Sequence, residues 1–345
     1  MKTILITGGA GFIGSTFTHY IYNNYPDYRI IVVDCLTYAG AVENLPIDIC
    51  KEESSRFQFW YGNITNGELM DTVVSQADII VHFAAETHVT RSIYDNTQFF
   101  VTDVIGTHTL CNAICKYQDQ VERFIHISTS EVYGTAIGEA MDEDHPLNPA
   151  SPYAAAKAGA DRLVYSYWNT YGLPATIIRP FNNFGPRQHL EKVVPRFVTS
   201  VILNEKLRIH GDGESARDFV LAEDHCKAID CVLHAEREKV VGEVFNVGTG
   251  VHRSINSLAH DICCIMDVND EEMTERVGDR PGQVVRHTAG VEKIKSVLGW
   301  EPATSWEDGL SQTIQWYRDN RHWWEKQVWM REIPIITASG NRELH

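Results

Sequence analysis

The feature that most constrains the fold is a glycine-rich turn near the start of the chain, between a predicted strand and a predicted helix. Residues 3–7 are apolar and rich in β-branched side chains, which is typical of a buried parallel strand, and residues 15–25 form an amphipathic stretch. Between them lies the sequence GGAGFIG, residues 8–14. Strand, glycine turn and helix in this order indicate a dinucleotide-binding unit, in which the helix N-terminus meets the pyrophosphate.

The glycines of this turn have separate predicted tasks. Gly8 makes the tight turn, Gly11 lets the backbone approach the pyrophosphate, and Gly14 lets the helix lie close to the strand. A second predicted strand, residues 29–33, ends at Asp34. An acid in that place accepts hydrogen bonds from the adenosine ribose 2′-hydroxyl and repels a 2′-phosphate, so the sequence favours NAD over NADP.

Strands and helices alternate through the first half of the chain. Further strands are predicted at 57–61, 79–83, 123–128 and 175–179, with helices at about 67–75, at 96–117 and around Tyr153 and Lys157. This alternation predicts an α/β fold of the Rossmann type, a doubly wound parallel sheet covered by helices on both faces. Ligands in such folds lie beyond the carboxyl ends of the strands, where Gly8, Asp34, Ala84, Ser128 and Phe181 all fall.

A different kind of sequence begins after Pro180. Short strands are predicted at 208–210 and 245–247, with a helix at 255–266 and an aromatic stretch at 316–329. We therefore expect an NAD-binding domain over 1–180 with a return segment near 219–248, a smaller α+β substrate-binding lobe over 181–332, and a polar, loosely ordered tail over 333–345.

Tyr153 and Lys157 are candidates for proton-transfer chemistry. A spacing of four residues puts both side chains on one face of a helix. An ammonium group beside a phenol favours the phenolate and is expected to lower the phenol pKa from about 10. Ser130 and Glu131, which follow the predicted strand 123–128, supply a second proton-transfer group.

Composition limits the other possibilities. The net charge of −16 argues against general nucleic-acid binding, which needs a basic surface. The eight cysteines include no CxxC pair and the fifteen histidines no HExxH motif, so no metal site is predicted. We find no signal peptide and no apolar run of about 18 residues, so we expect a cytoplasmic protein with reduced thiols that does not enter the membrane.

Several longer segments together resemble a known family. They include VDCLTYAG at 33–40, STSEVYG at 128–134, SPYAAAKAGAD at 151–161, RPFNNFGPRQ at 179–188, EKVVP at 191–195 and DRPG at 279–282. The chain resembles the extended short-chain dehydrogenase/reductases that act on nucleotide-diphosphate sugars, and looks most like the dTDP-glucose 4,6-dehydratases. The resemblance runs nearly end to end, and implies a homodimer that holds NAD tightly.

The resemblance implies a reaction in which NAD oxidises carbon 4 of the sugar, water is lost across carbons 5 and 6, and the hydride returns to carbon 6. Tyr153, assisted by Lys157, takes the proton of the 4-hydroxyl, and Glu131 takes the proton of carbon 5. Thr129 hydrogen-bonds the 4-oxygen and Ser128 supports the strand end.

The resemblance also implies binding residues. Those expected at the cofactor are Gly8, Gly11, Phe12, Ile13, Gly14, Asp34, Thr37, Asn63, Ile64, Ala84, Ala85, Ser128, Tyr153 and Lys157. Those expected at the sugar nucleotide are Glu86, His88, Thr90, Asn183, Glu191, Lys192, Arg217 and Arg280.

Ser130 departs from the family pattern, which has an aspartic acid there to protonate the leaving 6-hydroxyl. A serine hydroxyl can only relay a proton. Several readings therefore stay open: a 4,6-dehydratase, a 5,6-dehydratase that releases an unsaturated sugar, a UDP-glucuronate decarboxylase, a 4-epimerase, or an NAD-binding regulatory protein without catalysis. The nucleotide base, thymine or uracil, and the 2-substituent of the sugar also stay open.

Overall fold

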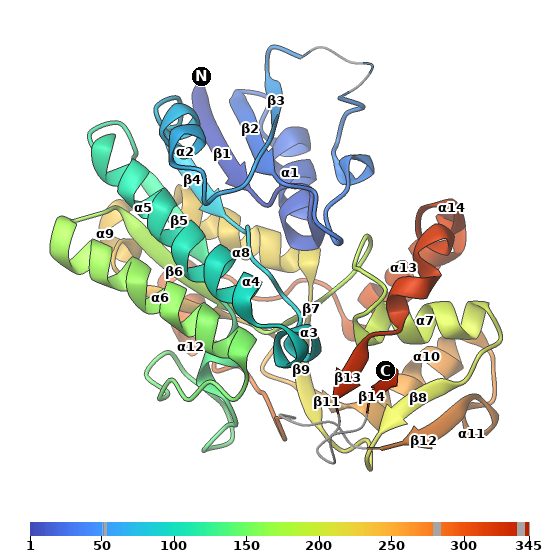
Figure 1. The fold of residues 1–345 in the computed structure, drawn as a ribbon. Helices are drawn as coiled ribbons and strands as arrows, with labels where there is room; N and C mark the ends of the chain where they lie inside the picture. The colour runs from blue at the N-terminus through green and yellow to red at the C-terminus, as the bar shows by residue number, and fades with distance from the viewer. Residues whose placement is uncertain (50, 52–53, 279–283, 337–341, 345) are drawn as a thin grey trace.

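A seven-stranded parallel sheet forms the centre of the molecule (Figure 1). The computed structural model describes residues 1–49, 51, 54–278, 284–336 and 342–344. The strand order is β10-β6-β5-β4-β1-β2-β3. The strands are β1 (Lys2–Thr7), β2 (Tyr28–Asp34), β3 (Phe57–Tyr61), β4 (Ile79–His82), β5 (Arg123–Ile127), β6 (Ala175–Pro180) and β10 (Val244–Val247). The predicted doubly wound fold is confirmed, and the six predicted strands of the first half lie within one residue of their observed ends.

Helices cover both faces of this sheet because its strands are apolar on both sides. Ile4 and Ile6 of β1 belong to one buried core with α1 (Phe12–Asn24) and α8 (Ala222–His234), whereas Leu5 belongs to the core on the opposite face. Alternate side chains of a strand point to opposite faces, which accounts for this division. The opposite face is covered by α2 (Gly67–Val74), α5 (Thr107–Lys116) and α6 (Pro152–Tyr171).

The helix predicted at 96–117 is interrupted, which corrects the sequence-based expectation. The structure has α4 (Thr97–Phe99), a π-helical segment η2 (Phe100–Gly106) and then α5, preceded by a separate helix α3 (Val89–Tyr94). A π-helical turn holds an extra residue, which side-chain periodicity over a long window does not reveal. The buried Asp103 of η2 accepts a hydrogen bond from the Glu86 backbone N–H at 2.8 Å.

A second group of elements packs around its own core beside the carboxyl ends of the sheet (Figure 1). It holds a three-stranded sheet in the order β11-β9-β7, a parallel pair β12-β8 and several helices. The strands are β7 (Asn182–Phe184), β8 (Leu207–His210), β9 (Ala216–Leu221), β11 (His252–Ser254) and β12 (Thr274–Val277). The helices are α7 (Val193–Ile202), α10 (Ile255–Met266), α11 (Asp270–Met273), α13 (Trp306–Asp319), α14 (Arg321–Trp324) and η4 (Glu325–Arg331).

The chain passes back to the main sheet between these elements. β9 leads directly into α8, and β10 then pairs with β6 at the sheet edge. Three short helices, η1 (Val42–Asn44), α9 (Arg237–Val240) and α12 (Glu292–Leu298), complete this part of the chain. The domain boundaries at 180 and 332 stay a prediction.

The C-terminal segment differs from its prediction. Residues 333–345 were expected to be loosely ordered, but β13 (Pro334–Ile336) and β14 (Arg342–Leu344) pair as an antiparallel ladder. Strand pairing depends on a partner segment, and a polar composition gives no sign of it.

Among the described residues, no helix has both the length and the apolar character needed to cross a membrane. Seven cysteines fall in the described ranges, at positions 35, 111, 115, 226, 231, 263 and 264, and all are free thiols.

Candidate active site

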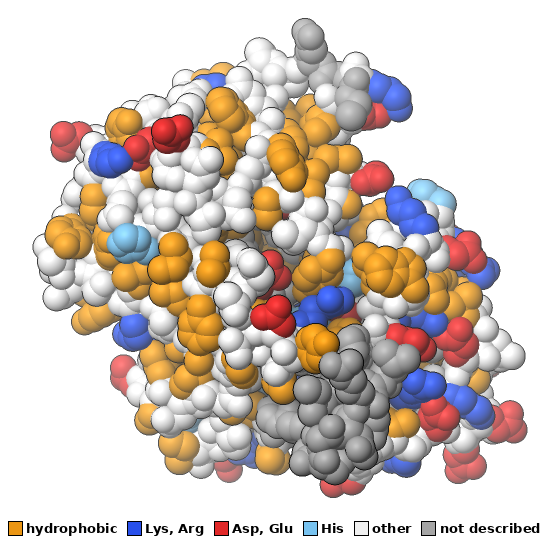
Figure 2. All heavy atoms as spheres, in the orientation of Figure 1, with side chains coloured by type: hydrophobic (Ala, Val, Ile, Leu, Met, Phe, Trp, Pro, Cys, Tyr) orange, Lys and Arg blue, Asp and Glu red, His pale blue; other side chains and the backbone are white. Residues whose placement is uncertain are grey.

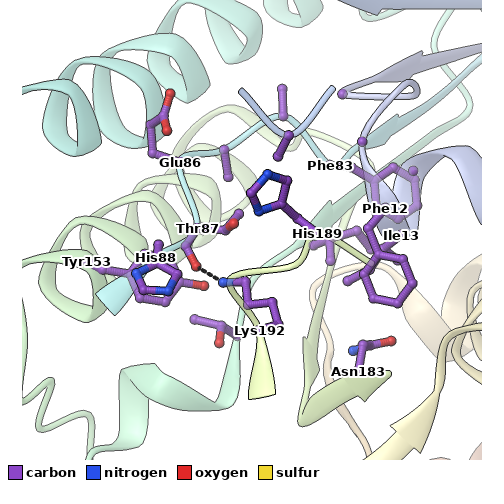
Figure 3. Close-up of a pocket in the computed structure, with 18 of the residues that line it drawn as sticks. Phe12, Ile13, Phe83, Glu86, Thr87, His88, Tyr153, Asn183, His189 and Lys192 are labelled. Atoms are coloured by element: carbon purple, nitrogen blue, oxygen red, sulfur yellow. Dashed lines mark hydrogen bonds between the residues drawn. The ribbon is translucent and has the colours of Figure 1, made fainter. Parts of the chain in front are cut away.

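A pocket of about 380 Å³ opens at the carboxyl ends of the central strands. It is lined by every residue predicted for the cofactor, for catalysis and for the substrate, with the exception of Arg280, which lies outside the described residues. In Figure 3, Phe12 and Ile13 lie on one side of this pocket, and Tyr153 and His88 lie on the other. The structure therefore brings the predicted residues together, while their individual roles stay predictions.

The glycine turn is shaped for close approach by a ligand. Gly8 has φ +70°, and a Cβ atom there would lie 2.6 Å from the backbone nitrogen of Ala84. A Cβ on Gly14 would lie 2.2 Å from the Gly8 carbonyl oxygen. Helix α1 starts after Gly11, which has no side chain to cap it. The free N–H groups at this helix start face the pocket end where Phe12 and Ile13 lie, as anion binding requires.

Asp34 closes the same end of the pocket. Its Oδ2 accepts a hydrogen bond from the Ala10 N–H at 2.9 Å, and its Oδ1 accepts one from the Leu36 N–H at 2.8 Å. Burial raises the pKa of this carboxyl, and the backbone N–H groups oppose that effect. Each carboxylate oxygen can accept a second hydrogen bond, so Asp34 can hold the glycine turn and still accept a hydrogen bond from a hydroxyl group.

Tyr153 and Lys157 lie one turn apart on α6, as predicted. The N-terminus of this helix is stabilised because the Ser151 side chain accepts a hydrogen bond from the Ala154 N–H and Pro152 occupies the first turn. Lys157 Nζ donates to the Ile127 carbonyl at 2.8 Å, which fixes the ammonium below the sheet end.

The expected lowering of the Tyr153 pKa is not what the structure shows. Burial raises the pKa of Tyr153, a hydrogen bond with Thr129 works against this, and Asp103 and Glu131 raise it further. Burial also lowers the pKa of Lys157, against the attraction of Asp103 and Asp161. In the protein alone the phenol is therefore protonated, because the desolvation of both groups outweighs the helical spacing.

Thr129, Ser130 and Glu131 occupy the short helix η3 (Ser130–Tyr133) and its cap. Thr129 Oγ1 accepts the Glu131 N–H at 3.2 Å, which directs this turn into the pocket. The preceding Ser128 donates to Asp161 Oδ2 at 2.7 Å, and Asp161 is held by the buried Arg179. Ser128 therefore has a structural partner, and its support of the strand end stays a prediction.

Charged side chains make hydrogen bonds and electrostatic contacts on the side of the pocket that is expected to hold the substrate. Lys192 Nζ donates to the Thr87 carbonyl at 2.6 Å, the contact drawn in Figure 3. Burial alone would raise the pKa of Glu191, but the neighbouring His88, Lys192, His189 and Arg91 lower it to about 2.

Two predicted substrate residues already have partners within the protein. Asn183 Oδ1 lies 3.0 Å from His225 Nδ1, and its amide nitrogen donates to the Phe181 carbonyl at 3.0 Å. His88 caps α3 by accepting the Arg91 N–H at 3.2 Å. These contacts orient both side chains at the pocket wall.

Sequence reasoning missed several residues that surround these groups. Tyr38 and Arg91 bind Glu191, Asp103 raises the pKa of Tyr153, and His287 Nδ1 lies 3.4 Å from Ser130 Oγ. Of these, Asp103 occurs within a helix that was predicted as uniform, and the others come from separate parts of the chain. Only the fold places them at the site.

The comparisons with known proteins agree with this geometry. Residues 5–313 match the family described as GDP-mannose 4,6 dehydratase. The chain belongs to the GDP-mannose 4,6-dehydratase family. Within this family it is 41% identical over 327 residues to a dTDP-glucose 4,6-dehydratase of Streptomyces niveus, covering 93% of this chain and 94% of the relative.

Other family members differ in length or in the name they carry. The chain is 40% identical over 328 residues to a trifunctional UDP-glucose 4,6-dehydratase, 3,5-epimerase and reductase of Arabidopsis thaliana, covering 94% of this chain but only 48% of that relative. The chain thus spans about half the length of this plant protein. A crystal structure of dTDP-glucose 4,6-dehydratase from Streptomyces venezuelae, with NAD and TYD bound, is 40% identical with a TM-score of 0.88, covering 94% of this chain and 99% of that one.

Proposed function

We propose that this family member is an NAD-dependent 4,6-dehydratase of nucleotide-diphosphate hexoses. The observation that carries the proposal is the convergence in one pocket of the glycine turn, the Tyr153 and Lys157 pair, and Glu131. Relatives named as dehydratases at about 40% identity over nearly the whole chain support it. The product is a 4-keto-6-deoxy sugar.

The residues present fit NAD. The Gly8 position cannot hold a Cβ, the start of α1 offers free N–H groups, and the Asp34 carboxylate suits a ribose without a 2′-phosphate. When bound, NAD would supply a hydride acceptor for carbon 4 and, once reduced, the hydride for carbon 6. The family relative from Streptomyces venezuelae was solved with NAD, which supports the same assignment here.

The chain's own residues move the protons. Tyr153, deprotonated in the complex with NAD, accepts the proton of the 4-hydroxyl, and the buried Lys157 ammonium stabilises the phenolate before that transfer. Thr129, which hydrogen-bonds the Tyr153 phenol, orients the 4-oxygen. Once carbon 4 is a ketone, the carbon 5 hydrogen is acidic, and Glu131 removes it.

The substrate side supplies cations for a diphosphate. Arg217 and Lys192 line the pocket beside Asn183, and we assign them to the phosphate oxygens. Arg280 is assigned to the same group from the sequence resemblance. Glu86, His88 and Thr90 line the wall next to Tyr153, and we assign them to the sugar hydroxyls.

One assay separates the candidate reactions. The protein is incubated separately with dTDP-glucose, UDP-glucose, UDP-N-acetylglucosamine and UDP-glucuronate, and the product masses are read. A product lighter than its substrate by one water, with a 4-keto group by NMR, supports the proposal, whereas a product of the same mass with a 5,6 double bond would identify a 5,6-dehydratase. Loss of carbon dioxide from UDP-glucuronate alone would identify a decarboxylase, and an epimer of unchanged mass would identify an epimerase. Tight NAD binding without turnover of any substrate would favour a regulatory protein.

We also propose that the protein is a homodimer through the face formed by η2 and α6. Phe100 and Ile105 of η2 are 43% and 52% exposed, and Tyr165 and Tyr171 of α6 are 40% and 58% exposed. η2 and α6 pack together, and Figure 2 shows hydrophobic side chains gathered over this side of the molecule. Light scattering during size-exclusion chromatography tests this, because an Ile105→Glu variant should elute as a monomer.

A cytoplasmic location is the remaining part of the proposal. All seven cysteines that the structure describes are free thiols, which supports a reducing compartment. Fractionation of cells that express the tagged protein tests it.

A further inference from the structure

Ser130 stands where the dehydration reaction needs an acid, and its surroundings are unusual for a serine at a pocket wall. The residue is buried, yet it lines the pocket between Thr129 and Glu131. Its hydroxyl has an imidazole neighbour, since Ser130 Oγ lies 3.4 Å from His287 Nδ1. A hydroxyl held against an imidazole can pass a proton in a way that an isolated serine cannot.

His287 is rigidly placed although it comes from a part of the chain far from Ser130. Its backbone N–H donates to the Ala216 carbonyl at 3.0 Å, and its ring packs edge-on against Phe181 with ring centres 6.3 Å apart. The side chain is fully buried. The imidazole therefore has little freedom to turn away from Ser130.

Glu131, the predicted base at carbon 5, faces the same imidazole nitrogen. Glu131 Oε1 lies 4.0 Å from His287 Nδ1, which leaves a small movement to a hydrogen bond. Serine, histidine and glutamate thus form a compact group in which the imidazole touches both residues that face the substrate.

Burial is the main reason that His287 is uncharged at rest. Burial, together with Arg217 and His145, lowers the pKa of the imidazole to about 4, although Glu131 and the Gly134 backbone favour the charged form. A neutral imidazole can accept a proton, and one with a low pKa gives that proton up readily. These are the properties of a transient proton carrier.

We propose that Glu131, His287 and Ser130 form a relay that carries the proton taken from carbon 5 to the leaving 6-hydroxyl group. This inference rests on the proposed 4,6-dehydratase function. Ser130 touches the substrate in this scheme, and His287 acts through Ser130 and Glu131 as a positioning residue. The relay takes the place of the carboxylic acid that the family pattern has at position 130.

The proton balance of the elimination step closes within these three groups. The C5–H bond breaks and its proton goes to Glu131, while its electron pair forms the C5–C6 double bond. The proton then moves from Glu131 to His287 Nδ1 and from there to Ser130 Oγ. Ser130 gives its own hydroxyl proton to the 6-oxygen, the C6–O bond breaks, and water leaves. Carboxylate, neutral imidazole and hydroxyl are restored.

The test uses the full chain with NAD and the hexose nucleotide that it dehydrates, and it follows two steps separately. Cofactor reduction in a single turnover reports oxidation at carbon 4, and product mass reports elimination. In the His287→Asn variant, oxidation should keep its rate and elimination should fall about 10²-fold. The control His260→Asn removes an exposed imidazole that contacts Asp270 in another part of the chain, and it should change neither step.

Rescue provides the readout that a merely structural role would not give. Ser130→Asp introduces a carboxylic acid beside the leaving group, so the double variant Ser130→Asp/His287→Asn should regain most of the elimination rate. Failure of this rescue, with the variant folded by circular dichroism, would contradict the relay. Histidine NMR of the protein without substrate is an independent readout: Glu131→Gln should lower the His287 pKa further, because it removes a carboxylate 4.0 Å away.

The two proposals fail in different ways. If the unaltered protein dehydrates no hexose nucleotide, the proposed function is wrong and the relay falls with it. If the unaltered protein and His287→Asn eliminate water equally fast, the function stands and the relay is wrong.

Discussion

Arg91 and Glu191 form an ion pair that joins two parts of the pocket wall, with Arg91 Nε donating to Glu191 Oε2 at 2.8 Å. The guanidinium also lies over the Tyr38 ring, 4.2 Å from its centre, and the Tyr38 hydroxyl donates to Glu191 Oε1 at 2.9 Å. Tyr38 lies in the loop after β2, Arg91 lies in α3, and Glu191 lies in the segment before α7. Glu191 therefore links the cofactor side of the pocket to the substrate side.

This network makes stability depend on pH at Glu191. Its folded-state pKa of about 2 lies below the ordinary value of 4.5, so the carboxylate stabilises the fold fully above pH 4.5. The contribution, about 3 kcal/mol, is lost as the pH falls through 2. Urea unfolding of Glu191→Gln should show a deficit near this size at pH 7 that shrinks toward pH 2. The exposed Glu139→Gln is the control, and a deficit independent of pH would contradict this account.

The glycine turn predicts a loss of both stability and cofactor binding in Gly8→Ala. The new Cβ would lie 2.6 Å from the Ala84 nitrogen in a left-handed backbone conformation, so we expect a destabilisation of about 1 to 3 kcal/mol. Thermal unfolding with and without NAD measures both effects. Gly67→Ala is the matched control, since its Cβ would meet only Thr109 at 4.0 Å. Equal stability of the two variants would refute the steric argument.

We expect Asp34 to determine the preference of the protein for NAD over NADP. In Asp34→Asn, an amide nitrogen replaces one acceptor oxygen and faces either the Ala10 or the Leu36 N–H. We expect NAD to bind about tenfold more weakly and the preference over NADP to narrow. Calorimetric titration with both cofactors measures this, with the exposed Asp27→Asn as control. An unchanged NAD preference would show that Asp34 acts only within the turn.

We expect substitutions of Tyr153 and Lys157 to slow the first chemical step, the oxidation of carbon 4. Tyr153→Phe removes the proton acceptor and Lys157→Met removes the buried ammonium, and both should slow oxidation at carbon 4 by about 10²- to 10⁴-fold while the protein still binds NAD. Single-turnover absorbance of the reduced cofactor measures the step. Tyr171→Phe, on the exposed face of the same helix, should behave like the unaltered protein. Normal oxidation by Tyr153→Phe would assign the base to another group.

Local patterns predicted much of the fold and the position of the site. The ends of strand β3 and of helix α10 were both predicted as observed. Apolar residues recur with a different period in strands and in amphipathic helices, so both kinds of element can be recognised in the sequence. The spacing of Tyr153 and Lys157 was informative because α6 is one uninterrupted helix.

What the sequence did not reveal depends on contacts between distant segments. The π-helical segment that holds Asp103 packs against α6, and the partners of Glu191 lie 100 and 153 residues away. His287 is 157 residues from Ser130. The effect of burial on Tyr153 was missed for the same reason, since desolvation is a property of the folded protein.

The central claim is that one catalytic cycle oxidises carbon 4 and returns the same hydride to carbon 6 after water has left. The most direct test uses a hexose nucleotide carrying deuterium on carbon 4, with product analysed by mass spectrometry and NMR. The account predicts a 4-keto-6-deoxy product, lighter than the substrate by one water, with the deuterium on carbon 6. Deuterium that remains on carbon 4, or a product that has lost carbon dioxide, would contradict it.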